Sequence, residues 1–535
     1  MRVTNNMINK NTKYNVNTNK YLVDKYNTQM TTQKKISKAS EDPVIAIRSL
    51  RLSTNMSHMS QYKTNIDDAE SWLDVTETAL TNMKSILTDV RTQCVKGSTD
   101  TLTAEDRGAI LQSLSALVEQ VYTEGNADYA GRTVFTGYRT TSNLTFNTAE
   151  ADTTYEISQA FTIADVQEHR YYTGDVSVPA VITGDTIDCP TEVEQNNYNR
   201  IRLAYNNIDK ISSMEISLDD GSDITVDMTA GTITSSVISE DSDGDEIEVV
   251  ADLGTVSTYA TYEEWEESIG SQTVNNDEIV FIESTGEVIF GKEIATTLRR
   301  GNAEFQTTYI KTGFEVGEAR PEYYYDCRDV SNCLDGNGDI DSDLAEKYAV
   351  DYTKENQIIE YTVATNTKMQ VNTQASDVFD TSIQRDVQEM IDVVQKAIQA
   401  HDKVDQIEKM MKEEQYADKE SQAKLQTYLD AATKEADYAD DNLQKTYSQY
   451  ITNFDNYLNK TNEAITNVGS TLSRISLTKT RVENQYVTIE ELKSSNEDRD
   501  ISDIMIDFYA AYDAYRASLT AASKVGSQSL LDYLR

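Results

Sequence analysis

Apolar residues recur every three or four positions from Leu443 to Ile489, and no proline interrupts them. This spacing places the apolar side chains on one face of an α-helix. At about 1.5 Å of rise per residue, a helix over this stretch is a rod about 70 Å long. A rod of that length is more typical of an assembly strut than of an enzyme core, so the chain is constrained to an extended helical architecture.

A second long helix is predicted to end at Gly97. Ser40 or Asp42 can cap its start, and Pro43 suits the first helical position. Only 4 prolines occur in 535 residues, so long uninterrupted helices are permitted. Shorter helical patterns follow at residues 110–121 and 383–398.

The last stretch, residues 501–535, carries a helical stripe made of Ile501, Ile504, Phe508, Tyr512, Tyr515, Leu519, Ala522 and Val525. Such a stripe needs a partner, and residues 5–33 form a second candidate helix. That helix is rich in Asn and Thr, and its apolar rows form no clean seam; they are Met7, Tyr14 and Tyr21, and then Val16, Val23 and Met30. We expect the two end segments to lie side by side, and to be weakly helical or disordered until a partner covers them.

Two interpretations of these end stripes stay open. They form either a coiled coil closed within one molecule or a seam that neighbouring copies complete. Periodicity alone does not separate the two. The N-terminal segment is weakly helical, and the C-terminal stripe is too apolar to stay exposed to solvent. This combination favours assembly with neighbouring copies.

The middle of the chain, residues 141–356, differs in charge and in pattern. It holds 45 acidic and 12 basic side chains, so we expect a separate body exposed to solvent. Alternating segments at 224–228, 247–249 and 288–290 predict short antiparallel strands. Residues 357–379 predict a hairpin, which we expect to pair near a short strand at Val134–Phe135.

Together these patterns predict a mainly α fold, a long antiparallel helical coiled-coil rod built from both chain ends, with an inserted β-rich outer domain. Residues 1–42 with 496–535 are expected to form a terminal coiled-coil core domain. Residues 43–140 with 357–495 are expected to form a helical rod domain with a β-hairpin. Residues 141–356 then form the acidic outer domain.

Several functions are excluded by composition and spacing. The net charge of −42 argues against nucleic-acid binding, which needs a basic face. No stretch is apolar and long enough for membrane insertion, and the N-terminus lacks the apolar core of a cleaved signal peptide. The histidines His58, His169 and His401 lie far apart, and no catalytic or phosphate-binding motif stands in its required context. We therefore expect no enzyme activity, no cofactor and no metal site.

Two local features leave alternatives open. Cys94 continues a helical stripe and is expected to be a buried thiol, whereas Cys327 and Cys333 either stay free or close a small disulfide loop. Acidic residues from Asp335 to Glu346 match the spacing of a calcium loop, although Ile340 stands where the sharp turn wants glycine. The segment is either a cation site or a solvated acidic loop, and residues 241–245 are a weaker example of the same pattern.

Five blocks of sequence resemble the flagellin superfamily, and they occur in the same order. They are MRVTNNM at 1–7, ISKASEDPVIAIRSLRL at 36–52, NIDDAESWL at 65–73, GRTVFTGY at 131–138 and SLLDYL at 529–534. The resemblance covers roughly residues 1–140 and 357–535. It does not cover the middle, which varies in length and sequence across that superfamily.

The resemblance implies a structural component of the bacterial flagellum. The first and last blocks are similar to the members that join hook to filament. It further implies export of the unfolded chain through the flagellum-specific type three apparatus without cleavage, followed by assembly outside the cell as a layer of identical copies. The implied partners are hook-associated protein 1 below this layer, flagellin above it, and a cytoplasmic export chaperone that shields the C-terminal stripe.

The assembly interface is then expected at the two terminal stripes and at the turn and helix of residues 40–52, which supports subunit contacts in that superfamily. The candidate residues are Met7, Tyr14, Tyr21, Ser40, Asp42, Pro43, Ile501, Ile504, Phe508, Tyr512, Tyr515, Leu519, Leu530, Leu531 and Leu534. One alternative is flagellin itself, the bulk filament subunit. An enzyme on a coiled-coil stalk would need a catalytic constellation within residues 141–356, where none is visible, and an adhesin carried by that domain is compatible with a junction role.

Overall fold

The structure is a computed structural model that describes residues 5–99, 104–173, 176–178, 193–228, 230–240, 246–269, 274–335 and 340–527. The chain divides into two compact units. We call residues up to 70, 360–370 and from 471 onward the terminal unit, and residues 71–359 with 371–470 the central unit.

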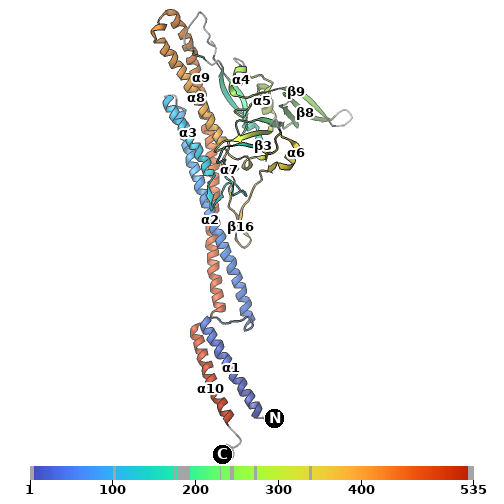
Figure 1. Ribbon diagram of the computed structural model, residues 1–535, viewed down its shortest axis with the longest axis vertical. Coiled ribbons are helices and arrows are strands. Elements are labelled where there is room, and N and C mark those ends of the chain that lie inside the picture. The colour runs from blue at the N-terminus through green and yellow to red at the C-terminus, as the bar shows by residue number, and fades with distance from the viewer. Residues whose placement is uncertain are drawn as a thin grey trace, which may run out of the picture. The chain divides into compact units, whose positions relative to one another are not determined.

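The terminal unit contains an antiparallel pair of helices, α1 (Asn5–Thr32) and α10 (Ile501–Ser527). The start of α1 and the end of α10 lie at the same end of the pair (Figure 1). The expectation that the two end segments lie side by side is therefore confirmed for the described residues.

Two longer helices contribute to both units: α2 (Pro43–Gly97) and α9 (Lys419–Glu497). Within the terminal unit they pack antiparallel, and Lys479 forms ion pairs with Asp67 at 3.0 Å and Glu70 at 2.6 Å. A hairpin of β15 (Glu360–Ala364) and β16 (Thr367–Gln370) lies on this pair. The side-chain amide of Asn65 on α2 donates to the Thr362 carbonyl at 2.8 Å, which fixes the hairpin to the helix.

The helical body of the central unit combines its parts of α2 and α9 with α3 (Ala104–Gly125), α7 (Ala375–Val378) and α8 (Ser382–Met411). Fully buried residues line these helices, among them Leu80, Met83, Val90, Leu114, Val121, Met390, Val394 and Phe454. A Cβ atom on Gly97 would lie only 2.4 Å from the Tyr447 ring, so α2 ends at a residue whose backbone is in close contact with α9.

Beside α8 and α9 lies a sheet of 12 described strands, antiparallel except where β9 pairs parallel with β10 (Figure 1). In spatial order the strands are β14 (Val350–Tyr352), β13 (Asp326–Asp329), β3 (Glu150–Thr162), β12 (Glu304–Phe314), β6 (Lys210–Ser217), β7 (Ser222–Asp227), β8 (Thr232–Glu240), β9 (Glu246–Tyr259), β10 (Glu278–Ile282), β11 (Glu287–Phe290), β5 (Glu194–Arg202) and β4 (Gln167–Thr173). A separate small ladder pairs β1 (Asp128–Tyr129) with β2 (Arg132–Thr133).

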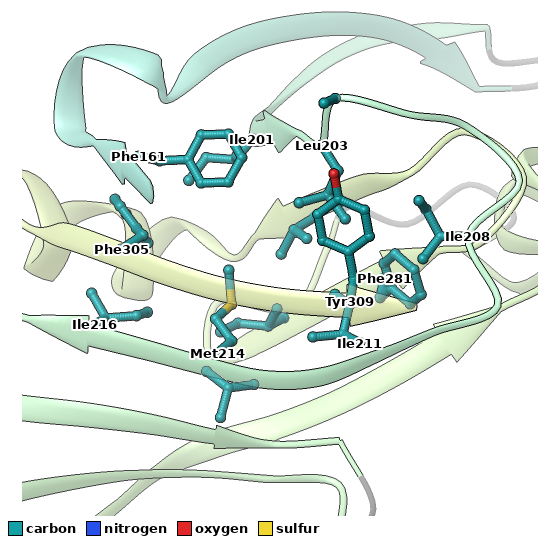
Figure 2. Packing of buried hydrophobic residues seen from close by; sticks show 14 of the residues in the cluster. Phe161, Ile201, Leu203, Ile208, Ile211, Met214, Ile216, Phe281, Phe305 and Tyr309 are labelled. Carbon is teal, nitrogen blue, oxygen red and sulfur yellow. The ribbon is translucent and has the colours of Figure 1, made fainter. Parts of the chain in front are cut away.

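The sheet has a different core on each face, because alternate residues of a strand point to opposite sides. One face carries the large cluster drawn in Figure 2, which includes Ile201, Phe281 and Tyr309 and is covered by α5 (Lys292–Arg300). The other face carries Tyr198, Ile289 and Trp265, the last from α4 (Tyr262–Ile269). A further short helix, α6 (Ser342–Tyr348), follows β13.

The predicted fold class is confirmed: long helices from both ends of the sequence pack together, and a β-rich body is inserted between them. Two details were wrong: one pair of neighbouring strands is parallel, and the short strand ends at Thr133 rather than covering Val134–Phe135. Within residues 357–379 the two hairpin strands pair with each other, and the Ala375 N–H that follows them donates to the Phe135 carbonyl at 3.0 Å. The predicted segment therefore does meet the chain at Phe135.

The cysteines settle one open alternative. Cys94 is a buried thiol as predicted, and burial raises its pKa to about 12. Cys327 and Cys333 are both free, so the disulfide loop was wrong. The reason is that Cys327 faces the large sheet core, whereas Cys333 belongs to a separate small cluster with Val330 and Ala345.

Candidate functional site

The seam between α1 and α10 is thin. On α10 it runs through Ile504 and Ala511, which are buried, and on α1 the buried residue is Gln29. The side-chain amide of Asn19 reaches across to the Ala514 carbonyl at 3.4 Å. Val16, Val23 and Met30, one of the two rows noted in the sequence, are half-buried along the same seam.

Polar contacts tie this pair to the connections that follow α1 and precede α10. Lys34 forms ion pairs with Glu497 at 3.2 Å and Asp498 at 2.5 Å, and the Asp498 contact raises the pKa of Lys34. The backbone N–H of Lys35 donates to the Glu497 carbonyl at 2.6 Å. Arg499 contacts Asp507 and donates to the Gln29 side chain at 3.0 Å. The register of the helix pair is therefore fixed at this end.

Most apolar side chains of the pair face outward. The exposed ones are Met7, Ile8, Tyr14 and Tyr21 on α1, and Ile501, Met505, Ile506, Tyr509, Tyr512 and Leu519 on α10. The C-terminal stripe drawn from the sequence thus divides: Ile504 lies in the seam, Phe508, Tyr515 and Ala522 are half-buried, and Ile501, Tyr512 and Leu519 are exposed. Leu530, Leu531 and Leu534 lie outside the described residues. A single chain leaves a continuous apolar row on the surface of this pair.

The start of α2 has the capping geometry that the sequence indicates. The Asp42 carboxylate accepts from the backbone N–H groups of Val44 at 3.0 Å and Ile45 at 3.1 Å, and Pro43 is the first helical residue. Ser40 is exposed and is not the cap. Just inside the helix, Val44, Ile47 and Leu50 are 75%, 60% and 68% exposed. Their i, i+3 spacing, which places them on one side of α2, is a signal that was already present in the sequence.

The terminal unit also contains an open groove of about 650 Å³. Met59 of α2 and Thr365 at the tip of the hairpin form its walls, and α9 forms its floor. The α9 residues are Leu477, Thr480, Arg481, Asn484, Gln485, Thr488 and Ile489, which share one helix face. Sequence reasoning did not find this groove because it depends on where the hairpin folds.

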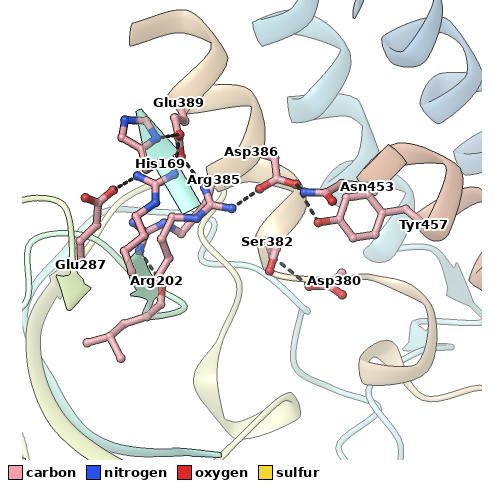
Figure 3. A network of polar contacts seen from close by, with 12 residues as sticks. His169, Arg202, Glu287, Asp380, Ser382, Arg385, Asp386, Glu389, Asn453 and Tyr457 are labelled. Carbon is pink, nitrogen blue, oxygen red and sulfur yellow. Dashed lines mark hydrogen bonds and ion pairs between the residues drawn. The ribbon is translucent and has the colours of Figure 1, made fainter. Parts of the chain in front are cut away.

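In the central unit, buried charges join the sheet to α8 (Figure 3). Arg200 on β5 pairs with Glu287 on β11 and Glu389 on α8, each at 2.5 Å. Arg202 contacts Asp386 on α8 and lies 3.0 Å from Glu389. The other Asp386 oxygen accepts from Asn453 and Tyr457 of α9, at 3.0 and 2.8 Å. We call this set, with Arg385 and His169, the ionic anchor.

Arg385 extends the anchor to the sheet loops: its guanidinium donates to the carbonyls of Leu203, Tyr205 and Thr285. Burial, reinforced by the like charge of Arg202, lowers the pKa of Arg385 to about 10, so the group stays charged at neutral pH. Two guanidinium groups, those of Arg200 and Arg202, therefore pair with the carboxylates of Glu287, Asp386 and Glu389, while the third is held by backbone carbonyls.

In the ionic anchor each pKa is set by two opposing effects: burial disfavours the charged form of a side chain, and the ion pairs favour it. Burial disfavours the ionised form of Glu389, but Arg200 and Arg202 outweigh it and hold the pKa of Glu389 well below its usual value. For Asp386 burial prevails and raises the pKa. Burial and the nearby Arg200 charge lower the pKa of His169, whose Nδ1 lies 3.2 Å from Glu389.

The structure describes some of the residues that the sequence analysis considered as catalytic or metal-binding groups, and others lie outside the described residues. His169 belongs to the anchor, a role the sequence did not suggest, because its partner stands more than 200 positions away. Asp341 caps α6, while Asn337, Asp339 and residues 241–245 lie outside the described residues. Across the part of the chain that the structure describes, no three His, Cys, Asp or Glu side chains are placed to hold a metal ion. Nor is any described helix both long and apolar enough to cross a bilayer.

Comparison with known proteins gives matches at the N-terminal side. Residues 3–140 match the bacterial flagellin N-terminal helical region. Over 117 residues the chain is 29% identical to flagellar hook-associated protein 3 of Escherichia coli (strain K12), a span of 22% of this chain and 37% of that one. Over 121 residues it is 27% identical to flagellin of Clostridium tyrobutyricum, a span of 23% and 32% respectively. The chain thus spans only about a third of the length of these relatives.

Solved structures give a weaker likeness. The crystal structure of flagellar hook associated protein-3 from Legionella pneumophila aligns over 83% of this chain and 97% of that one, with 10% identity and a TM-score of 0.28. A TM-score this low does not establish a shared arrangement of domains.

Proposed function

We propose that this chain, whose residues 3–140 match the bacterial flagellin N-terminal helical region, is a structural protein of the bacterial flagellum that joins the hook to the flagellin filament by polymerisation of its terminal helices. In this proposal the chain forms a short layer of identical copies between hook-associated protein 1 and flagellin. Its mechanism is packing between subunits, without turnover.

One observation carries the proposal: the α1 and α10 pair leaves most of its apolar side chains uncovered. Tyr14 is 70% exposed, Met7 57% and Tyr21 59%, and Ile506 on α10 is 67% exposed. Contiguous apolar surface of this kind marks an interaction site on a soluble protein. Burial of a large apolar side chain contributes about 1.5–3 kcal/mol, so neighbouring copies that cover this row gain a strong drive to associate.

The test is a sedimentation assay for assembly of the full chain. Replacing Met7, Tyr14 and Tyr21 together with Ser should abolish pelletable polymer, because the outward row of α1 is lost. The matched control replaces Tyr138 and Tyr348 with Ser; these are 64% and 60% exposed but lie in the central unit. Polymer formation by the triple variant at the wild-type concentration would contradict the proposal.

The position in the flagellum needs a second measurement, because flagellin is the alternative and a flagellin is among the similar proteins. The ends MRVTNNM and SLLDYL favour the junction role. In sheared flagella, quantitative mass spectrometry should find this chain at low abundance beside a second, major flagellin. If it is the bulk filament protein, the junction role is excluded in favour of the alternative.

The route to that position follows from the same proposal. The chain leaves the cell unfolded through the flagellum-specific type three apparatus, without cleavage, and a cytoplasmic chaperone covers the apolar row of α10 before export. Limited proteolysis of the free monomer should remove roughly 40 residues from each end while the helical body survives. Equal resistance of the ends and the body would contradict the need for a protective chaperone.

A further inference from the structure

Two apolar features of the terminal unit face solvent at different places. The first is the row Val44, Ile47 and Leu50 on α2, which we call the α2 ridge. The second is the groove floored by α9 from Leu477 to Ile489, which we call the α9 groove. Leu477 is 74% exposed, so its own chain does not fill the groove.

The shapes of the two features match. The ridge residues follow an i, i+3, i+6 spacing, which makes a narrow line along one helix. The groove residues of α9 recur at i, i+3, i+4, i+7 and i+8, which makes a long shallow channel, and Met59 and Thr365 close its side. Met59, Leu477 and Ile489 give the channel apolar positions among polar ones, and a helix that lays apolar side chains into a groove with such anchor positions is a common recognition mode.

The charges around the two features also match. Acidic Glu41 and Asp42 precede the ridge and basic Arg51 follows it, whereas basic Arg481 lies near one end of the groove and Glu491 follows the other. At about 1.5 Å per residue, Asp42 and Arg51 lie about 14 Å apart along α2, and Arg481 and Glu491 about 15 Å apart along α9. A parallel alignment therefore places opposite charges together at both ends.

The ridge of a chain cannot enter its own groove. The Ile45 carbonyl accepts from the Asn496 side chain at 3.1 Å, and Ser49 contacts Glu497. These contacts hold the ridge beside the end of α9, beyond the last groove residue, Ile489. A second copy of this chain offers the complementary shape and charge.

We propose that the α2 ridge of one copy docks, parallel to α9, in the α9 groove of the next copy. This inference rests on the proposed function and specifies one contact of the assembly. Because the two surfaces differ, the contact is heterologous, and repeating it generates a ring or an open helix rather than a closed dimer. Such a contact suits a layer of identical copies.

A cross-linking experiment tests the contact directly. Chains carrying Ile47→Cys and chains carrying Gln485→Cys, a groove residue that the parallel alignment places level with Ile47, are mixed, assembled and oxidised, and a covalent dimer should form only in the polymer. Disulfides need Cα atoms about 4.4–6.8 Å apart, so the test is sensitive to register. The matched control pairs Ile47→Cys with Val487→Cys, which is 51% exposed on the same helix but outside the groove. The parent chain controls for its native cysteines.

The outcomes distinguish failure of the proposed function from failure of the ridge-and-groove contact. If the parent chain does not polymerise, the proposed function fails. If polymers form but Gln485→Cys cross-links no better than Val487→Cys, the ridge-and-groove contact is wrong while the assembly role stands. A cross-link from Ile47→Cys to flagellin or hook-associated protein 1 in a mixed assembly, and not to a second copy, overturns the choice of occupant.

Charge exchange gives a second, independent readout. Arg51→Glu or Glu491→Arg alone should raise the critical concentration for assembly about fivefold, because each places like charges together at one end of the groove. The double variant should recover most of the loss. Both side chains that carry the test, Arg51 and Glu491, are exposed in one chain, so the thermal unfolding of the monomer should not change. Additive losses in the double variant would overturn the parallel alignment.

Discussion

The terminal helix pair and the ionic anchor solve opposite packing problems. Among the described side chains of α1 and α10, only Gln29, Ile504 and Ala511 are fully buried, and aromatic and aliphatic groups face solvent. In the anchor, by contrast, Arg200 is 3% and Asp386 0% exposed. One surface exposes what proteins usually bury, and the other buries what they usually expose.

The difference shows which surfaces are completed within one chain. Buried ionic groups are tolerated only when every charge meets a partner, and the anchor supplies those partners from β5, β11 and α8. The terminal pair has no such closure, since a two-helix seam cannot cover both helices. The anchor thus positions the sheet on the helical body, whereas the terminal pair keeps apolar side chains uncovered.

The largest effect is expected from Arg200→Ala in the anchor. It leaves Glu287 and Glu389 buried without their main partner, which should cost the central unit about 3–5 kcal/mol of unfolding free energy. Both tryptophans, Trp72 and Trp265, lie in the central unit, so fluorescence in urea reports its unfolding.

The matched control is Arg170→Ala, which removes a cation that is 39% exposed and 3.8 Å from Asp441. Exposed pairs contribute about 0–1 kcal/mol, so this variant should unfold almost as the wild type does. Equal losses in the two variants would break the comparison, because the anchor would then behave like surface charge.

A smaller effect is expected in the terminal pair. Ile504→Ala should loosen it by about 2 kcal/mol, the low end for a buried isoleucine, because only one side of the seam can relax around the cavity. Hydrogen exchange of the α1 and α10 amides measures this local stability. Ile506→Ala, at a site 67% exposed, should stay within about 0.5 kcal/mol in the monomer. A loss at Ile506 as large as that at Ile504 would mean that the seam lies elsewhere.

Local signals in the sequence were enough to predict the helices of the rod. Asp42 and Pro43 mark the start of α2 and Gly97 its end, and the apolar spacing from Leu443 follows α9. Capping and periodicity depend on neighbours within a few residues, so they can be read without the fold. The alternating segments at 224–228 and 288–290 were likewise found as β7 and β11.

What escaped prediction depends on distant partners or on weak patterns. The apolar stripe seen in the sequence starts only at Leu443, yet α9 begins at Lys419 and buries Ala432, Ala436 and Ala439. Alanine is only weakly hydrophobic, so alanines that pack between helices give little signal in a hydrophobicity pattern. Arg200 and Arg202 stand on a strand face that looks solvent-exposed in the sequence, because their partners on α8 are nearly 190 positions away. The spacing of the α2 ridge residues is visible in the sequence, but their exposure to solvent could be known only from how α9 packs.

Acid should destabilise the central unit, which contains the ionic anchor, at a pH where the terminal helix pair keeps its stability. The folded pKa of His169 is lowered, so its contribution is present above its ordinary value of 6.5 and is lost as the pH falls toward the folded pKa. Glu389, also lowered, adds a second loss below its ordinary 4.5. Asp386 opposes both, because its raised pKa lets the folded state take up a proton first.

The central unit should therefore lose up to about 1.4 kcal/mol per pH unit for each net proton, beginning below pH 6.5. Tryptophan fluorescence in urea measures this loss, and His169→Gln should remove the window above pH 4.5 while leaving the lower one. Exchange in α1 and α10 should not change in that upper window, since their described seam contains no histidine. A parallel loss in both regions would show that the anchor does not act alone.

The smallest effect tests whether the start of α2 is formed before any partner binds. Asp42→Ala removes the acceptor for two backbone N–H groups and should cost about 1 kcal/mol, whereas Asp42→Asn keeps an acceptor and should cost less. Exchange of the amides from Val44 to Leu50 in the monomer reports this difference. One outcome would contradict a preformed helix start: Asp42→Ala leaves the exchange of these amides unchanged in the monomer but impairs assembly. In that case the first turn of α2, like the terminal pair, is incomplete in one chain, and the neighbouring copy orders the α2 ridge when it binds.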